Sequence, residues 1–296
     1  MSMPMESIIK QPSGVSGRQS ETEDQILTET GFFWRERSGV KVLVSRNLED
    51  AGFVNGFSTR LGGVSPFPEN SLNLAGFNED SAENIYENRR RFLAGISSEM
   101  QLAAVWQVHG DAIKTVDCSE DIGDSSDYAD AIVSRLTGVL AGVKTADCVP
   151  VLLGDPQTGA FAAVHAGWRG TVQSIVKKTV LRMKKVYGSN PKDLICAIGP
   201  SASGCNYEIG EDVISAFAEN FEGSEKYFSP TRTGHALVDL HRANRDQLIV
   251  SGVADENIST APFCTMARPD LFFSYRLEKK KYGKTGRLMS VIGRRG

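Results

Sequence analysis

The sequence predicts an α/β (α+β) fold, a single mixed-sheet domain with flanking helices. Short β-branched segments alternate with a few longer stretches of helical periodicity, and no internal repeat is evident. The chain has 296 residues, 41% hydrophobic and 23% charged, which is ordinary for a soluble globular protein. Because no interior linker stands out, residues 31–296 are expected to form one domain.

The first 30 residues differ in composition from the rest of the chain. They are rich in Ser, Glu, Gln and Gly and have few apolar residues, so they can bury little surface to offset the entropy cost of ordering. We therefore predict a disordered tail over residues 1–30. It lacks the hydrophobic core of a signal peptide, and the five cysteines have no CxxC spacing, so a reducing, cytoplasmic location is expected.

The elements follow in order along the folded part. Alternating or continuous apolar patterns predict strands at 40–44, 54–59, 103–107, 113–116, 131–133, 139–143, 149–153, 160–164, 194–198, 271–275 and 288–292. Helical periodicity predicts helices at 81–95, 171–187, 211–221 and 237–250. Ser81 is a suitable N-cap for the first helix, and Gly188 a suitable C-terminal stop for the second.

The charge balance excludes two classes of partner. The net charge is −3, so no basic surface for nucleic acid is expected. No apolar run approaches the length of about 20 residues that a membrane-spanning helix needs. The expected partners are therefore small molecules, with the chain acting as a monomer or a homodimer.

Two histidines and one cysteine stand in short motifs of small residues. They are His109 in WQVHG, Cys148 in TADCVP and His165 in VHAGWRG, and the whole chain contains only four histidines. Two imidazoles and a thiolate suit a tetrahedral zinc that keeps one position open for water or substrate. Their spacing is too long for a zinc finger, so the three side chains must meet in the folded core.

Each member of this trio also has an ordinary structural interpretation. A lone histidine after an apolar strand is more often a satisfied core residue, and a free cysteine is commonly an inert small hydrophobe. Asp147 beside Cys148 indicates a functional environment, in which Cys148 is either a metal ligand or a nucleophile paired with a histidine. Asp147 itself is a candidate proton carrier or ligand-orienting group. The other two histidines, His235 and His241, are expected to be structural.

Four further polar residues are candidates for binding an anionic substrate. Arg60 lies in a glycine-rich loop, Asn73 in SLNL, Arg169 at the turn before the helix at 171–187, and Arg276 in FFSYR. An arginine can clamp phosphate or carboxylate with two hydrogen bonds, although each of these could equally be a surface ion-pair member. The helix start after His165 also favours an anion.

Together these motifs resemble the YfiH family, also called the laccase-domain or multicopper polyphenol oxidoreductase family. The resemblance runs from about residue 52 to 293 and is carried by STRLGGVS, SLNL, NRRRF, WQVHG, ADA, TADCVPVLL, AVHAGWRGTV, AIGPSASGCNYEIG, VDLHRANRDQL and FFSYR. TADC followed by HAGWRG is the most specific part. One departure is Leu277, where many members carry a second arginine after FFSYR; Arg287 is the candidate to replace it.

The resemblance implies a fold related to the cytotoxic necrotising factor toxins and zinc held by His109, Cys148 and His165. It further implies phosphorolysis of adenosine, inosine and methylthioadenosine, with purine nucleoside and phosphate as substrates, and deamination of adenosine. Catalytic roles would fall on His109, Cys148, His165 and Asp147, and substrate binding on Arg60, Asn73, Arg169 and Arg276.

Three alternatives remain at this stage. Cys148 with His165 as its base would make a hydrolase, for instance of peptidoglycan precursors. Copper can replace zinc by affinity order, but the copper-dependent phenol oxidation of older family labels needs more histidines than four. The third alternative is a binding module without enzymatic activity.

Overall fold

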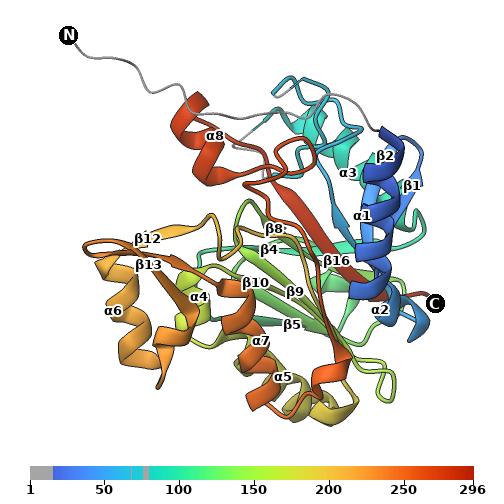
Figure 1. Cartoon of the computed structure of the whole chain (residues 1–296). Helices are drawn as coiled ribbons and strands as arrows, with labels where there is room; N and C mark the ends of the chain where they lie inside the picture. Colours follow the sequence, from blue (N-terminus) through green and yellow to red (C-terminus); the bar gives the residue numbers. More distant parts are fainter. Residues whose placement is uncertain (1–15, 68, 76–79) are drawn as a thin grey trace.

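Two mixed β-sheets lie face to face at the centre of the molecule (Figure 1). The structure is a computed structural model that describes residues 16–67, 69–75 and 80–296. The first sheet has the order β1 (Phe32–Arg37), β2 (Val40–Ser45), β3 (Val54–Ser58), β16 (Leu288–Arg294), β8 (Val139–Thr145), β4 (Gln101–Trp106), β6 (Gly123–Tyr128). Its strands are antiparallel except for the parallel pairs β8–β4 and β4–β6.

The second sheet carries most of the candidate site. Its order is β15 (Ile258–Thr260), β11 (Ile195–Ile198), β9 (Val149–Gly154), β10 (Phe161–Ala166), β7 (Ala131–Ser134), β5 (Ile113–Val116). The pairs β15–β11 and β7–β5 are parallel and the others antiparallel. A small third sheet follows, with β12 (Glu208–Gly210), β14 (His235–Val238) and β13 (Phe228–Arg232).

Helices flank both sheets. They are α1 (Ser16–Thr30), α2 (Arg46–Asp50), α3 (Ala82–Ile96), α4 (Trp168–Val172), α5 (Ile175–Tyr187), α6 (Glu211–Asn220), α7 (Leu240–Val250) and α8 (Tyr275–Tyr282). This arrangement confirms the predicted mixed α/β fold with flanking helices. No helix among the residues described is long and apolar enough to cross a lipid bilayer.

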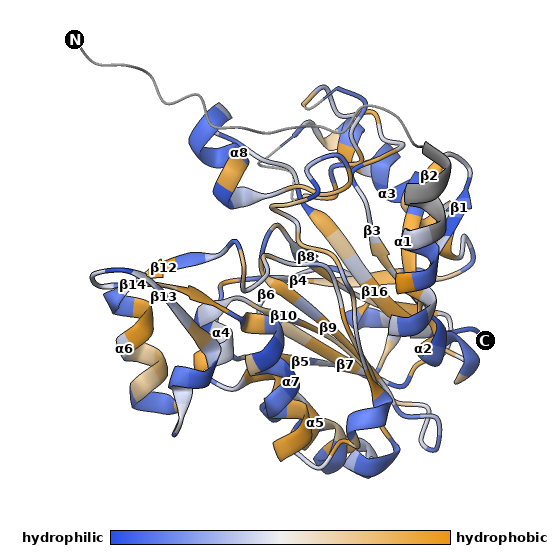
Figure 2. Cartoon of the chain, in the orientation of Figure 1, coloured by the Kyte–Doolittle hydropathy of each residue, from blue (hydrophilic) through white to orange (hydrophobic). Residues whose placement is uncertain are grey.

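The core is layered because side chains alternate across each strand. Leu43 and Leu152 point into the cluster between the two sheets, whereas their neighbours Val42 and Val151 point into clusters on the outer faces. Figure 2 shows the resulting concentration of hydrophobic residues in the central strands. Helix α3 covers the outer face of the first sheet, and α5 and α7 cover that of the second.

The N-terminal segment differs from the prediction of a disordered tail. Its second half forms α1, whose Leu27 is 2% exposed and belongs to the cluster between the sheets. Glu23 accepts hydrogen bonds from Trp34 Nε1 and Arg268 Nη1, both at 2.9 Å. Leu27 and the two hydrogen bonds to Glu23 thus hold α1 against the rest of the molecule, although the composition of this helix does not by itself indicate burial. Residues 1–15 lie outside the described part of the chain.

Three further predicted elements need correction. The strand predicted at 271–275 is absent: Phe272 and Phe273 are fully buried, but they lie in a loop, and Ser274 caps α8. The helix predicted at 171–187 is two helices, broken at Ser174, whose φ of 60° is left-handed. The helix predicted at 237–250 begins only at α7, because the preceding residues form β14.

Candidate metal centre and pocket

His109, Cys148 and His165 meet at one end of the two sheets. His109 lies in the loop after β4, Cys148 between β8 and β9, and His165 near the end of β10. One ligand atom from each residue lies within 4.8 Å of the others, and the two imidazole rings are edge to face. His165 is 3% exposed, whereas His109 is exposed to the solvent side. The fold therefore brings together three side chains that are far apart in the sequence.

Asp130 holds both histidines in place. Its Oδ1 lies 2.7 Å from His165 Nδ1 and accepts a hydrogen bond from the His109 backbone N–H at 2.9 Å. Its Oδ2 accepts from the N–H groups of Val108 and Gly110 at 3.2 and 2.7 Å. These bonds stabilise the left-handed backbone of His109, whose φ is 60°. They also place the Nδ1 proton of His165 toward Asp130, so that Nε2 faces the other members of the trio.

Sequence reasoning missed Asp130 as a functional residue. The available signal was an acid in Ala129-Asp130-Ala131, directly before an apolar strand, where a fully buried carboxylate needs a compensating partner. Gly167 was missed as well. A Cβ on Gly167 would lie 3.0 Å from both Cys148 Sγ and His109 Cδ2, so any larger residue here would press on two members of the trio.

Charge coupling within the trio favours the ionised thiol. Burial opposes ionisation of Cys148, but His165 and His109 outweigh burial and lower its pKa to about 6. Burial likewise disfavours the imidazolium form of His165, yet the Cys148 thiolate and Asp130 raise its pKa to about 9. The thiolate is the form that binds metals and attacks electrophiles, so this electrostatic environment suits either role.

Asp147 supports the loop that carries Cys148. Its carboxylate accepts hydrogen bonds from Thr265 Oγ1 at 2.6 Å, Ser274 Oγ at 2.9 Å and Arg276 N at 2.7 Å. Burial raises the pKa of Asp147 in spite of these bonds. Its φ of 83° is left-handed, which is uncommon for a residue other than glycine. Thr265, the N-cap Ser274 and Arg276 in the first turn of α8 thus fix the turn between β8 and β9.

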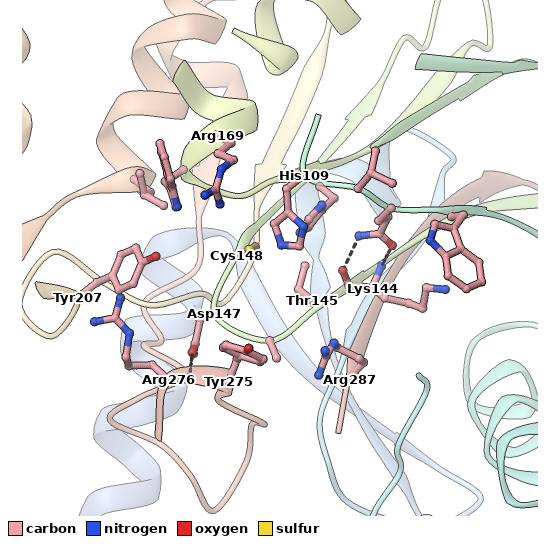
Figure 3. Close-up of a pocket in the computed structure, with 17 residues that line it drawn as sticks. His109, Lys144, Thr145, Asp147, Cys148, Arg169, Tyr207, Tyr275, Arg276 and Arg287 are labelled. Carbon is pink, nitrogen blue, oxygen red and sulfur yellow. Dashed lines mark hydrogen bonds between the residues drawn. The ribbon is translucent and has the colours of Figure 1, made fainter. Parts of the chain in front are cut away.

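The trio opens into a pocket of about 790 Å³, a size that suits a small organic substrate (Figure 3). Its lining also contains four cationic side chains and four large aromatic ones, namely Lys144, Arg169, Arg276, Arg287, Trp106, Trp168, Tyr207 and Tyr275. Arg169 stacks on Trp168 with its guanidinium carbon 4.2 Å from the ring centroid, and Arg276 on Tyr207 at 4.7 Å. The pocket therefore combines positive charge with flat apolar faces.

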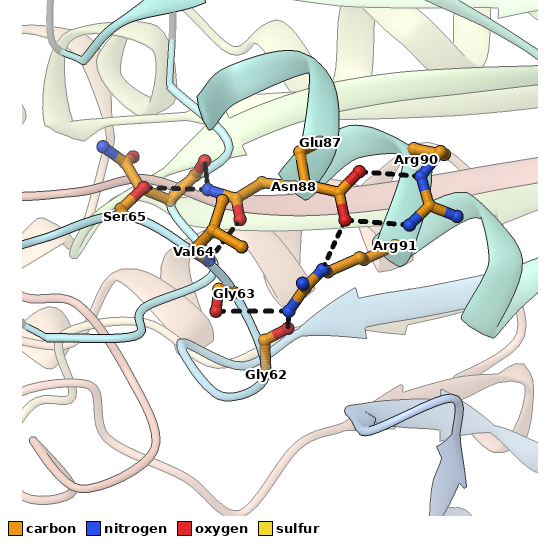
Figure 4. A network of polar contacts seen from close by, with 9 residues as sticks. Gly62, Gly63, Val64, Ser65, Glu87, Asn88, Arg90 and Arg91 are labelled. Carbon is orange, nitrogen blue, oxygen red and sulfur yellow. Dashed lines mark hydrogen bonds and ion pairs between the residues drawn. The ribbon is translucent and has the colours of Figure 1, made fainter. Parts of the chain in front are cut away.

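Arg60 is not part of this pocket, in contrast to the predicted role in substrate binding. It forms an ion pair of 3.0 Å with Glu278, and Nη1 donates to the carbonyl of Pro269 at 2.6 Å. The loop that follows Arg60 is fastened to α3 (Figure 4). Within it, Asn88 accepts from Val64 N at 2.9 Å and Arg91 donates to Gly62 O at 3.1 Å. These contacts give Arg60 and its loop a structural role.

Asn73 also lies outside the pocket lining, again unlike the prediction. Its Oδ1 accepts from the backbone N–H groups of Ala75 at 3.1 Å and Arg287 at 2.9 Å. Asn73 therefore acts on the pocket indirectly, by fixing the main chain of Arg287. Arg287 lines the pocket and Leu277 does not.

Fold and site together define a mixed α/β protein with a His₂Cys centre at the floor of a cationic pocket. Residues 54–295 match the family described as multi-copper polyphenol oxidoreductase laccase, and the chain belongs to this family. This is the laccase-like YfiH family that the sequence motifs indicate.

Curated relatives of this chain carry names that point to nucleosides. The chain is 37% identical over 245 residues to a purine nucleoside phosphorylase of Bacteroides thetaiotaomicron, covering 79% of this chain and 89% of the relative. It is 37% identical to one from Deinococcus radiodurans, covering 86% and 93%. Among solved structures, YlmD of Geobacillus stearothermophilus aligns with a TM-score of 0.81 at 30% identity, covering 90% of this chain and 99% of YlmD. YfiH of Bacillus licheniformis aligns with 0.80 at 27% identity, covering 88% and 99%.

Proposed function

We propose that this protein is a zinc-dependent purine nucleoside phosphorylase that acts on adenosine, inosine and methylthioadenosine and also deaminates adenosine. The observation that carries the proposal is the trio of His109, Cys148 and His165 at the floor of a cationic, aromatic pocket. The relatives named purine nucleoside phosphorylase, which align over most of their length, support the substrate class.

The donor set fits zinc. Two imidazoles and one thiolate with a fourth position open are typical of catalytic zinc sites, in which donor atoms lie about 3.4–3.6 Å apart. The donors here lie within 4.8 Å of one another, a separation that small rotations of the exposed His109 side chain can close. The bond from Asp130 to His165 Nδ1 is the outer contact that zinc-binding histidines usually make. When bound, zinc would supply a Lewis acid beside the substrate.

The side chains of the pocket suit the two substrates of a phosphorylase. Phosphorolysis breaks the bond from C1′ of the ribose to the purine nitrogen and forms a bond from C1′ to a phosphate oxygen. Arg169 and Arg276 can bind phosphate, since neither forms an ion pair with a carboxylate of the described residues. Trp168, Tyr207 and Tyr275 offer faces for the purine, and placing both reactants in one pocket lowers the entropic part of the barrier.

The proposal is tested by metal analysis combined with a phosphate-dependent nucleoside assay on wild type and Cys148→Ala. We expect the variant to lose bound zinc and nucleoside turnover together, because one of three donors is removed. Cys118→Ala is a matched control, since Cys118 is exposed and outside the pocket lining. Full phosphorolysis by a metal-free Cys148→Ala protein would contradict the proposal.

A second candidate rests on the chain of contacts from Cys148 through His165 to Asp130. A low-pKa thiol, a histidine and a carboxylate in this order also make a cysteine hydrolase. Incubation with a thiol-directed alkylating agent separates the two candidates. Rapid labelling of Cys148 that stoichiometric zinc leaves unchanged would favour the hydrolase, whereas protection by zinc favours the phosphorylase.

The oxidase activity in the family's description has less support than the phosphorylase activity, because of the number and positions of the histidines. The chain has four histidines, and a multicopper oxidase needs many more to hold several copper ions. His241 bonds to Ser201 Oγ at 2.6 Å and His235 to the carbonyl of Thr233 at 3.1 Å. Neither residue lines the pocket that contains the trio.

A further inference from the structure

The side chain of Gln107 continues the pairing of two central strands beyond the point where their main chains separate. β4 and β8 pair in parallel up to Ala104 and Gly142, although both strands extend further along the chain. Beyond that point, Gln107 Nε2 donates to the carbonyl of Lys144, and Gln107 Oε1 accepts from the N–H of Lys144, both at 2.7 Å (dashed lines beside Lys144 in Figure 3). A glutamine amide carries the same donor and acceptor as a peptide group, so it takes the place of a main-chain partner from β4.

Two of the three side chains of the trio follow shortly after this bridge between Gln107 and Lys144. His109 comes two residues after Gln107, and Cys148 comes four residues after Lys144. The His109 segment, residues 107–109, and the Cys148 segment, residues 144–148, both line the pocket. The bridge therefore lies where the two segments diverge on their way to the metal centre.

The other supports of the trio hold these two segments by different contacts. Asp130 fixes the His109 main chain and the His165 ring. Asp147 ties the turn that carries Cys148 to the start of α8. The bonds between Gln107 and Lys144 instead run directly from the His109 segment to the Cys148 segment. They therefore set the distance at which the two segments begin to diverge.

We infer that Gln107 is a positioning residue of the metal centre, whose amide holds the His109 segment and the Cys148 segment at the separation that metal binding needs. The inference rests on the zinc centre of the proposed function and adds to it a residue that preorganises two of the three donors. The donor atoms of the trio lie within 4.8 Å of one another, so binding requires little rearrangement. Loosening the two segments should lower the affinity for metal, because binding would then also have to order them.

Two variants remove the bridge in different ways. Gln107→Glu keeps the length of the side chain but places a carboxylate oxygen against the Lys144 carbonyl, where two acceptors repel. Gln107→Asn keeps the amide but is one methylene too short to span the same gap. For both variants we expect zinc affinity, measured by competition with a chromophoric chelator, to fall about tenfold, at the lower end of the range for outer contacts of metal ligands. The cobalt-loaded variants should also show weaker thiolate-to-cobalt absorption per bound ion than cobalt-loaded wild type.

Asn55→Asp is the matched control, because Asn55 makes the same kind of bridge elsewhere in the first sheet. Its Oδ1 accepts from Ser45 N at 2.8 Å, and its Nδ2 donates to Ser45 O at 3.1 Å. Asn55 lies outside the pocket lining. Asn55→Asp should therefore lower the free energy of unfolding but keep the zinc affinity and the cobalt spectrum of wild type. An equal loss of zinc affinity in Asn55→Asp would reduce the Gln107 effect to general destabilisation and overturn the inference.

Wild-type zinc affinity and an unchanged cobalt spectrum in both Gln107 variants would also contradict the inference. A fall in nucleoside turnover alone would then mean that Gln107 acts on the substrate and not on the metal. The metal measurements need no nucleoside, so a wild type that binds zinc but releases no purine base would contradict the phosphorylase and not the role of Gln107. Gln107 and Lys144 are half-buried, so water can satisfy the released groups and both variants should fold; if one does not, the other decides the result.

Discussion

Two sides of the pocket differ in how their side chains are supported. On the metal side, formed by His109, Cys148, His165 and Asp130, the residues lie at strand ends and Asp130 is fully buried. On the arginine side, formed by Arg169, Arg276 and Arg287, the side chains come from two helix starts and a loop and rest on aromatic rings. On the metal side, Asp130 fixes the His165 ring and the His109 main chain, whereas the cationic groups of the arginine side rest on aromatic rings and can adjust to an anion.

Among changes on the metal side, removing the charge of Asp130, the carboxylate that contacts His165 Nδ1, is expected to have the largest effect on zinc affinity. Asp130→Asn keeps the size of the side chain but removes its charge, and we expect zinc affinity to fall about 10–100-fold. Competition with a chromophoric chelator measures this affinity. Asp155→Asn is the matched control, because Asp155 is also fully buried but lies in the turn between β9 and β10. If Asp130→Asn bound zinc as tightly as wild type, Asp130 would not support the metal side, and the contrast between the two sides would be wrong.

The pH dependence of metal binding tests the charge state of the same side. With pKa values of about 6 for Cys148 and about 9 for His165, the free site at pH 7 holds a thiolate and an imidazolium. Zinc needs neutral His165, so binding should release about one proton, and affinity should rise about tenfold per unit between pH 6.5 and 8.5. Calorimetry in buffers of different ionisation enthalpy measures the proton. An affinity that is constant over this range would show that the imidazolium assignment is wrong.

A smaller effect is expected on the arginine side. Arg276→Lys keeps the charge but loses the planar fork, so KM for phosphate should rise several-fold, on the order of fivefold, while zinc content stays at the wild-type level. Steady-state kinetics at varied phosphate measure this change. Arg60→Lys serves as the control outside the pocket, because its partner is Glu278. A loss of zinc in Arg276→Lys would mean that the two sides are not independent.

The same contrast explains what could be predicted from the sequence. The trio and the central strands were predictable, because rare histidines stood beside small residues and buried strands have clear apolar runs. Asp130 was missed, because the acid before an apolar strand was the only sequence signal and its role depends on a contact with His165, 35 positions away, that only the fold creates.

The residues of the arginine side were harder to predict, because the presence of a residue in a family motif does not determine which other residues its side chain contacts. Arg169 and Arg276 line the pocket. Arg60 instead forms an ion pair with Glu278. Asn73 accepts a hydrogen bond from the backbone N–H of Arg287 and does not line the pocket. The tail prediction was wrong over α1 because one residue, Leu27, anchors a polar helix in the core. The strand predicted at 271–275 was wrong because burial of Phe272 and Phe273 does not require a paired strand.

The central claim is that a metal held by His109, Cys148 and His165 is needed for phosphorolysis of purine nucleosides. The most direct measurement is stepwise addition of zinc to the metal-stripped wild-type protein, with phosphate-dependent release of purine base followed at each step. The account predicts negligible activity without metal and a linear rise that ends at one zinc per chain. Full phosphorolysis by the metal-stripped protein, unchanged by added zinc, would contradict it.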